Sequence, residues 1–260
     1  MQITIGCSYM LTTLLLLFGV SLGINLFMYL IAYTFQTDKL TDISYSITFI
    51  VLATWSFLLS DKSLAAILVL ILIYLWAVRL GTYLMVRIKH MGQDERFNDI
   101  RTNKLSFLGF WFVQGISVFI ISLSFLLHMI EGYSIDKRLL IVGTTISILG
   151  WGIEALADYQ KFKFKKSHPD QFMSTGLWSR IRHPNYLGEI LFWIGIPILQ
   201  WGNDFSINMI ALIGPLWICF LLLKFSGIPI LEKSWEKKYG EHPSFTEYKT
   251  KSYRLIPGIY

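Results

Sequence analysis

The sequence predicts an all-α membrane protein, a bundle of seven transmembrane helices. Two observations predict the membrane: 54% of the 260 residues are hydrophobic, and the mean hydropathy is +0.52, far more apolar than a soluble domain. A third observation, the charge distribution, supports the same prediction, because nineteen of the 23 Lys and Arg residues fall on one side of the predicted spans. No repeat or linker divides the chain, so we expect a single domain over 1–260, with N-terminal helices and a loop in 1–105 and a C-terminal half in 106–260.

Seven uninterrupted apolar stretches are predicted to span the membrane. They cover residues 10–35, 43–59, 63–85, 107–129, 139–157, 187–201 and 207–225. The first stretch is about 25 residues long and follows no basic region, so we expect a retained span and not a cleaved signal peptide.

The charges also predict the orientation. Lys and Arg gather on the cytoplasmic side of short loops, so we expect the N-terminus outside and the C-terminal tail in the cytoplasm, in a bacterial inner membrane. The net charge of +6 then follows from topology and from attraction to anionic lipid, and no nucleic-acid partner is expected. Two cysteines and five scattered histidines offer no metal-ligand spacing, so no metal site is expected.

The third span differs from the first two, which carry almost no ionisable residues. Trp76, Arg79, Tyr83 and Arg87 follow helical spacing and form one stripe. An unpaired cation inside a membrane is costly, so we expect Arg79 to face the bundle interior or a wet cavity, with snorkelling to the interface as the alternative. The mixed-charge stretch Gly92–Lys104 either covers a site or is a solvated loop.

The fifth span ends in a second charged stripe. Glu154, Asp158, Lys161 and Lys165 follow helical spacing as the chain leaves the membrane. A carboxylate inside an apolar segment either pairs with a cation or stays protonated, and Arg79 suits this pairing. The lysines either face lipid headgroups or supply cations to a phosphorylated cofactor.

Charges and a helix start crowd residues 175–189. Pro184 suits the first turn of a helix, where its missing N–H needs no partner, so a helix is predicted to begin there. Asn185 and Glu189 are four residues apart and share a face, and an apolar run over 190–199 follows. A carboxylate at the membrane edge indicates a functional site, with a basic interfacial anchor as the alternative.

The remainder of the chain is a seventh span and a basic tail. We expect Pro215 to kink the span. Trp235 and the tyrosines of the tail suit a segment that lies along the membrane interface. Glu232, Tyr239 and Tyr248 would instead close over a cytoplasmic site, and their spacing does not decide between the two.

These motifs resemble the C-terminal half of the membrane sterol reductases. The wider group includes the steroid 5α-reductases and bacterial proteins grouped as DUF1295. The isoprenylcysteine carboxyl methyltransferases share a similar Arg-His-Pro-x-Tyr core and a related tail. The resemblance covers roughly residues 150–260, and the Arg79–Tyr83 pair more weakly. It is carried by Arg-His-Pro-Asn-Tyr-Leu-Gly-Glu at 182–189, Lys-Tyr-Gly at 238–240, Tyr248, and Tyr-Arg-Leu-Ile-Pro-Gly-Ile-Tyr at 253–260.

This resemblance implies a cytoplasmic cofactor pocket in which NADPH reduces a carbon–carbon double bond of a membrane lipid, a steroid-like or other enone. It places Asn185 and Glu189 at the nicotinamide as the catalytic pair. Hydride delivery to an enone leaves an enolate that needs a hydrogen-bond donor and a proton, which a carboxylic acid in a dry site supplies. The cofactor-binding residues that it implies are Arg79, Tyr83, Glu154, Asp158, Lys161, Lys165, Arg182, His183, Asn185, Tyr186, Glu232 and Tyr248.

One departure concerns the substrate. Steroid 5α-reductases have a tyrosine three residues before the equivalent of Arg79, and this chain has Trp76, which donates one N–H but relays no proton. Two other functions stay open. The same turn would hold S-adenosylmethionine in a methyltransferase, although the many cations favour a cofactor with several phosphates. A non-enzymatic lipid-binding protein would leave Arg79 and Glu154 without a clear role. The substrate and the oligomeric state stay open too.

Overall fold

The computed structural model describes residues 2–91, 98–132 and 136–258, with side chains described from residue 8 and omitted over 88–99. This part of the chain is helical and contains no named strand, which confirms the all-α prediction. The elements are α1 (Gln2–Thr34), α2 (Thr41–Leu59), α3 (Leu64–Met91), α4 (Asn98–Arg101), α5 (Lys104–Glu131), α6 (Lys137–Ser167), a 3₁₀ turn (Gly176–Ser179), α7 (Pro184–Leu199), α8 (Phe205–Ala211), α9 (Ile213–Phe220), a π-helical turn (Leu221–Phe225), α10 (Ile228–Tyr239) and α11 (Pro243–Lys251).

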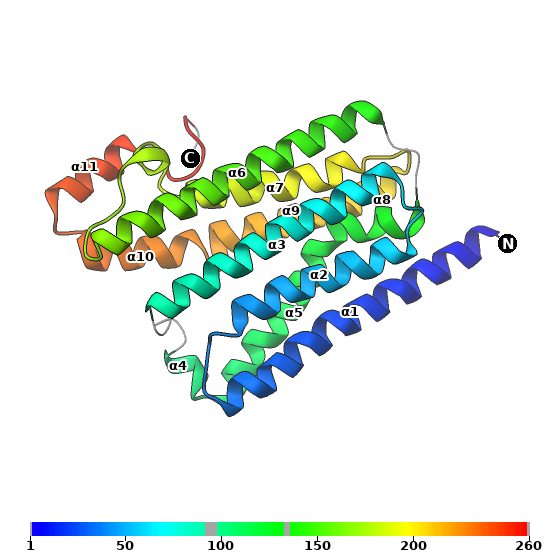
Figure 1. Cartoon of the computed structure of the whole chain (residues 1–260), viewed down its shortest axis with the longest axis horizontal. Helices are drawn as coiled ribbons and strands as arrows, with labels where there is room; N and C mark the ends of the chain where they lie inside the picture. The colour runs from blue at the N-terminus through cyan, green and yellow to red at the C-terminus, as the bar shows by residue number, and fades with distance from the viewer. Residues whose placement is uncertain (1, 92–97, 133–135, 259–260) are drawn as a thin grey trace.

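The long helices run side by side, and α10 and α11 lie at one end of the bundle, called here the tail end (Figure 1). At this tail end α6 ends, α7 begins, and α10 and α11 lie together with the C-terminus. The N-terminus and α8 lie at the opposite end. The connections therefore alternate between two ends, as the charge pattern predicts.

Six helices of the described residues are long and apolar enough to cross a membrane, judged by length and composition. Of the seven predicted spans, α7 falls short: its 16 residues extend about 24 Å, against about 30 Å for the hydrocarbon core of a bilayer. The helix begins at Pro184, as predicted. Seven spans therefore stay a prediction, whereas a multi-pass membrane protein is supported. The six spans are Ser8–Thr34, Thr41–Leu59, Leu64–Arg87, Lys104–Glu131, Lys137–Ser167 and Phe205–Tyr239.

Glycines bring α6 and α7 into backbone contact. A Cβ atom added to Gly143 or Gly150 of α6 would lie 2.2 Å from the nitrogen of Leu199 or 2.4 Å from that of Phe192. On α7, a Cβ at Gly188 would lie 2.5 Å from the nitrogen of Glu154. Small residues permit this approach between membrane helices. The contact places the predicted acidic residues of α6 and α7 next to each other.

A separate polar network joins α1, α2 and α5. The Asn25 amide nitrogen donates to Ser21 O at 2.8 Å, and its oxygen accepts from Ser44 Oγ at 3.1 Å and from Gln114 Nε2 at 2.9 Å. Arg101 of α4 pairs with Asp38 at 3.1 Å between buried side chains. These contacts are mutually satisfied, which favours a structural role for this part of the bundle. The stretch 92–104, which the sequence predicts to be either a cover over a site or a solvated loop, lies mostly outside the residues whose side chains are described.

Candidate functional site

Arg79 of α3 forms the centre of a buried ionic cluster with two carboxylates of α6. Its guanidinium pairs with Glu154, and its NH1 donates to Asp158 Oδ2 at 2.8 Å. Glu154 and Asp158 are 2% and 5% exposed. The predicted pairing of Arg79 with Glu154 is confirmed, and Arg79 faces the bundle interior. A buried ion pair costs desolvation, so its presence here calls for a structural or a chemical reason.

Helix α7 adds a third carboxylate to this cluster. Glu189 lies close enough to Arg79, Asp158 and Glu154 to interact with them electrostatically. No described residue hydrogen-bonds to its carboxylate. One turn earlier, the buried Asn185 Oδ1 also has no hydrogen-bond partner among the described residues. Glu189 is therefore the carboxylate of the cluster in which neither oxygen has a hydrogen-bond partner among the described residues.

Sequence reasoning missed Tyr45, which α2 contributes to the same cluster. Its phenol interacts electrostatically with Glu189 and Glu154, and its ring centroid lies 6.0 Å from that of Trp76. Trp76 itself is fully buried and stacks on Phe192 at 5.7 Å. The ring of Tyr45 thus lies beside Trp76, on the side of α2 that faces this cluster. No pattern within α2 alone would have identified it.

Arg182 instead binds the C-terminal tail. Its Nε donates to Glu232 Oε1 at 3.0 Å, and its NH1 donates to the carbonyl oxygens of Lys249 at 2.9 Å and Ser252 at 3.3 Å. Its backbone N–H donates to Tyr253 O at 2.8 Å, in an isolated parallel β-bridge of Ile181 with Tyr253. The family resemblance implied a cofactor-binding role for Arg182, but its Nε and NH1 donate within the protein.

His183 is fully buried beside Arg182. Its ring lies between Tyr186 and Trp235, with centroids 5.6 and 5.1 Å away. Its Nε2 donates to Glu232 Oε1 at 3.1 Å. Burial lowers the pKa of His183 although the Glu232 carboxylate opposes this shift, so the imidazole is neutral at pH 7. Its buried Nδ1 is then an acceptor, without a hydrogen-bond partner in the described structure.

The two lysines of α6 that were predicted to bind the cofactor, Lys161 and Lys165, differ in their contacts. The Lys161 ammonium lies over the rings of Trp178 and Trp235, at 4.6 and 5.3 Å from their centroids, and donates to no described side chain or carbonyl. Lys165 donates to Pro169 O at 3.2 Å, to Gln171 O and to the Tyr239 hydroxyl at 2.9 Å. Lys161 is thus the cation of this pair that can meet an anion.

The two remaining predicted residues lie at opposite edges of the site. Tyr83 interacts with Arg87 on α3. Tyr248 donates from its hydroxyl to Trp178 O at 2.6 Å, and burial raises the pKa of Tyr248. The tail therefore covers the turn before α7, one of the two arrangements that the sequence allowed.

Apart from Arg79 NH2, which is ion-paired with Glu154, four polar atoms of the predicted cofactor-binding residues are buried without a hydrogen-bond partner in the described structure. Buried polar atoms are usually satisfied, and exceptions mark places that a ligand or water completes. Three are acceptors and one is a donor, so the site suits a ligand that both donates and accepts. They are Arg79 Nε, Glu154 Oε2, His183 Nδ1 and Asn185 Oδ1.

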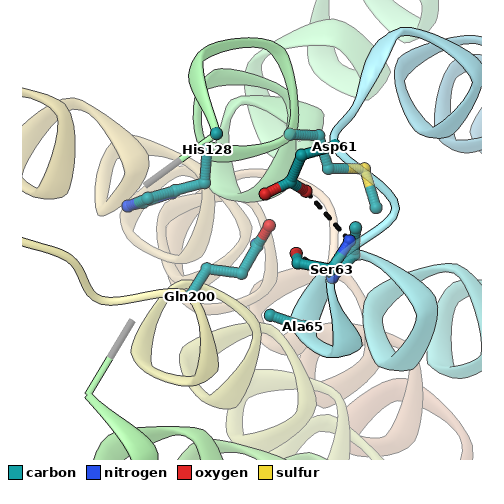
Figure 2. Close-up of a pocket in the computed structure, with 8 residues that line it drawn as sticks. Asp61, Ser63, Ala65, His128 and Gln200 are labelled. Atoms are coloured by element: carbon teal, nitrogen blue, oxygen red, sulfur yellow. Dashed lines mark hydrogen bonds between the residues drawn. The ribbon is translucent and has the colours of Figure 1, made fainter. Parts of the chain in front are cut away.

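Two hollows in the described structure are candidates for a ligand site. One is an open groove of about 570 Å³ beside Arg79, lined by Tyr74, Leu75, Val78, Arg79, Thr82, Tyr83 and Trp151. The other lies at the end opposite the tail, around His128, Asp61, Ser63 and Gln200 (Figure 2). Its volume is about 10 Å³, which is room for one water molecule. The groove is therefore the better candidate for an organic ligand.

A family model described as a protein of unknown function, DUF1295, matches residues 28–252. No curated protein and no solved structure matches the chain. The match confirms the expected DUF1295 membership.

Proposed function

Because the chain belongs to the DUF1295 family, whose function is unknown, we propose its activity from the site: NADPH-dependent reduction of a carbon–carbon double bond in a membrane-embedded lipid. The observation that carries the proposal is the convergence of Glu189, Tyr45 and Arg79, of which Arg79 also lines a groove in the bundle wall. An acid, a hydroxyl and a cation in a dry site are the groups that reduction of an enone requires.

The nicotinamide supplies the hydride when NADPH is bound. The residues of the chain then stabilise and protonate the substrate. The Tyr45 hydroxyl donates a hydrogen bond to the substrate carbonyl oxygen, where negative charge develops. Glu189, which has no hydrogen-bond partner among the described residues, holds the proton that the substrate receives. Arg79 keeps Glu154 and Asp158 in place, and the apolar helices exclude water.

The residues present fit this cofactor at its nicotinamide end. Asn185 Oδ1 and Glu154 Oε2 are buried acceptors for an amide or ribose donor, and His183 Nδ1 is a third. For the phosphates, the free ammonium of Lys161 is suited, because an unengaged cation attracts an anion. Arg182 and Lys165 are engaged by the protein, so we assign phosphate binding to Lys161 and anchoring of the tail to Arg182.

One observation favours a second candidate, a methyltransferase that uses S-adenosylmethionine. Three carboxylates surround the single guanidinium of Arg79, and this excess of acid suits a cationic ligand. The unsatisfied acceptors also suit an ammonium group and ribose hydroxyls. Like the reductase, this candidate is also supported by a family resemblance, here to the isoprenylcysteine carboxyl methyltransferases.

Calorimetric binding to the detergent-solubilised protein separates the two. NADPH is expected to bind and S-adenosylmethionine is not. Lys161→Ala is expected to weaken NADPH binding by about tenfold, which corresponds to about 1.4 kcal/mol. Lys163→Ala is the matched control, because this lysine is exposed on the same helix. Binding of S-adenosylmethionine alone would support the methyltransferase, and binding of neither would leave the protein without an enzymatic assignment.

A further inference from the structure

The groove beside Arg79 is formed by one face of α3 and by Trp151 of α6. Tyr74, Leu75 and Val78 are 37%, 49% and 55% exposed along it. Two contacts hold its walls: Trp151 Nε1 donates to Leu75 O at 3.4 Å, and the hydroxyls of Tyr74 and Thr54 of α2 are 2.7 Å apart. Its shape is thus fixed by contacts among three helices.

The groove opens toward lipid and not toward water. Both α3 and α6 are candidate membrane spans, and the groove lies within their lengths. Tyr74, Leu75, Val78 and Trp151 give it apolar walls. Pockets of about 300–1,000 Å³ hold small organic ligands, and the volume of about 570 Å³ falls within this range. An apolar ligand that is already dissolved in the bilayer would enter without crossing water.

The polar side of the groove restricts the ligand further. Arg79, Thr82 and Tyr83 line it, and each carries a hydrogen-bond donor. Arg79 is already neutralised by Glu154 and Asp158, with Glu189 nearby. Because Arg79 is already ion-paired, an anionic headgroup would have to compete with Glu154 and Asp158 for it, whereas a neutral oxygen would accept hydrogen bonds from the donors that line the groove.

We propose that this groove binds an uncharged membrane lipid, with its hydrocarbon part on the α3 face between Tyr74 and Val78 and a hydrogen-bond-accepting oxygen at Arg79 and Tyr83. This inference rests on the proposed function only in taking the groove as the place where the substrate lipid binds before its carbonyl reaches Tyr45. The binding itself needs no NADPH and is tested without it, so either can fail alone.

The test is photolabelling of the full chain in phosphatidylcholine nanodiscs. The probe is a long-chain methyl ketone with a diazirine on its chain and an alkyne handle, and adducts are mapped by mass spectrometry. We expect adducts on residues 74–83 and on Trp151. Val78→Trp fills the groove and should lower these adducts by about tenfold. Leu149→Trp is the matched control, because Leu149 is 58% exposed on another face of α6.

Thermal unfolding of both variants verifies that each tryptophan leaves the fold intact, as expected at exposed positions. If Val78→Trp fails to fold, excess unlabelled ketone provides the same test, since it should suppress the adducts in the unaltered chain. Adducts spread evenly over lipid-facing helices, such as α1 at Leu15 and Phe27, would overturn the site. Equal labelling by the corresponding diazirine fatty acid would overturn the restriction to uncharged lipids.

Discussion

At the scale of single residues, Glu154 and Glu189 differ in what surrounds them. Glu154 is ion-paired with Arg79. Glu189 has no hydrogen-bond partner among the described residues, although it lies near the same guanidinium. A carboxylate held in an ion pair keeps its neighbours in place, and one without a hydrogen-bond partner is free to exchange a proton. We therefore assign the chemistry to Glu189 and the positioning to Glu154.

This division of roles predicts two different phenotypes. Glu189→Gln keeps the size and polarity of the side chain but removes its acidity, so kcat of NADPH oxidation with an enone lipid should fall by about 10²–10⁴-fold with NADPH binding retained. Tyr45→Phe should also lower kcat, because it removes the hydroxyl that donates to the substrate carbonyl oxygen. Glu154→Gln breaks a buried ion pair, so it should lower the temperature of unfolding. Steady-state kinetics, calorimetry and thermal unfolding measure these effects, and unchanged kcat in Glu189→Gln would contradict the assignment.

At the scale of elements, the close contact of α6 and α7 determines how far apart these two glutamates lie. Gly150 of α6 leaves no space for a side chain, because a Cβ there would lie 2.4 Å from Phe192 N and 2.6 Å from Gly188 O. Both of these atoms belong to the backbone of α7, which cannot rotate away. The two helices would have to separate to admit even a methyl group.

Gly150→Ala is therefore expected to destabilise the protein by about 1–3 kcal/mol, as overpacking does, and to lower turnover by separating Glu154 from Glu189. Gly152→Ala is the matched control on the same helix, because a Cβ there meets nothing within 4 Å. Alanine is also the better helix former by about 1 kcal/mol, so this variant should be neutral or more stable. Thermal unfolding measures both, and equal stability would show that α6 and α7 are not tightly packed.

The elements show how much of the site could be predicted from sequence. Apolar runs predicted the long helices, and Pro184 marked the start of α7 because a proline at the first turn is a local property. The cost of a buried cation predicted the pairing of Arg79. By contrast, Arg182 donates to the carbonyls of Lys249 and Ser252, and backbone acceptors that lie so far along the chain leave no pattern in side-chain types.

The helix α6 shows a pattern that the sequence does reveal. The apolar run ends near residue 157, and the charged residues beyond it keep helical spacing, which predicted a charged stripe on a helix that leaves the membrane. The helix continues to Ser167, as this spacing indicates. Tyr45 marks a second limit: nothing in α2 alone indicates that α6 and α7 bring their carboxylates to it.

At the scale of the whole molecule, connections alternate between two ends of the bundle (Figure 1). The turn before α7 lies at the tail end, and the connection from α7 to α8 lies at the other end. The charge distribution then predicts that the tail end is cytoplasmic. With 16 residues, α7 reaches across the membrane only if the bilayer thins locally or its flanking residues lie at the interfaces.

Two exposed positions that flank α7 test both the orientation and the number of spans. In a chain whose two cysteines are replaced by serine, Asn203→Cys should react with a membrane-impermeant maleimide in intact cells. Ser179→Cys should react only after the membrane is permeabilised, as should Lys251→Cys in the tail. Labelling of Ser179→Cys and Asn203→Cys from the same side would mean that α7 does not cross and that the chain has six spans. Labelling of all three positions with sides exchanged would reverse the orientation, and a cofactor from the cytoplasm would then have no access to the tail end.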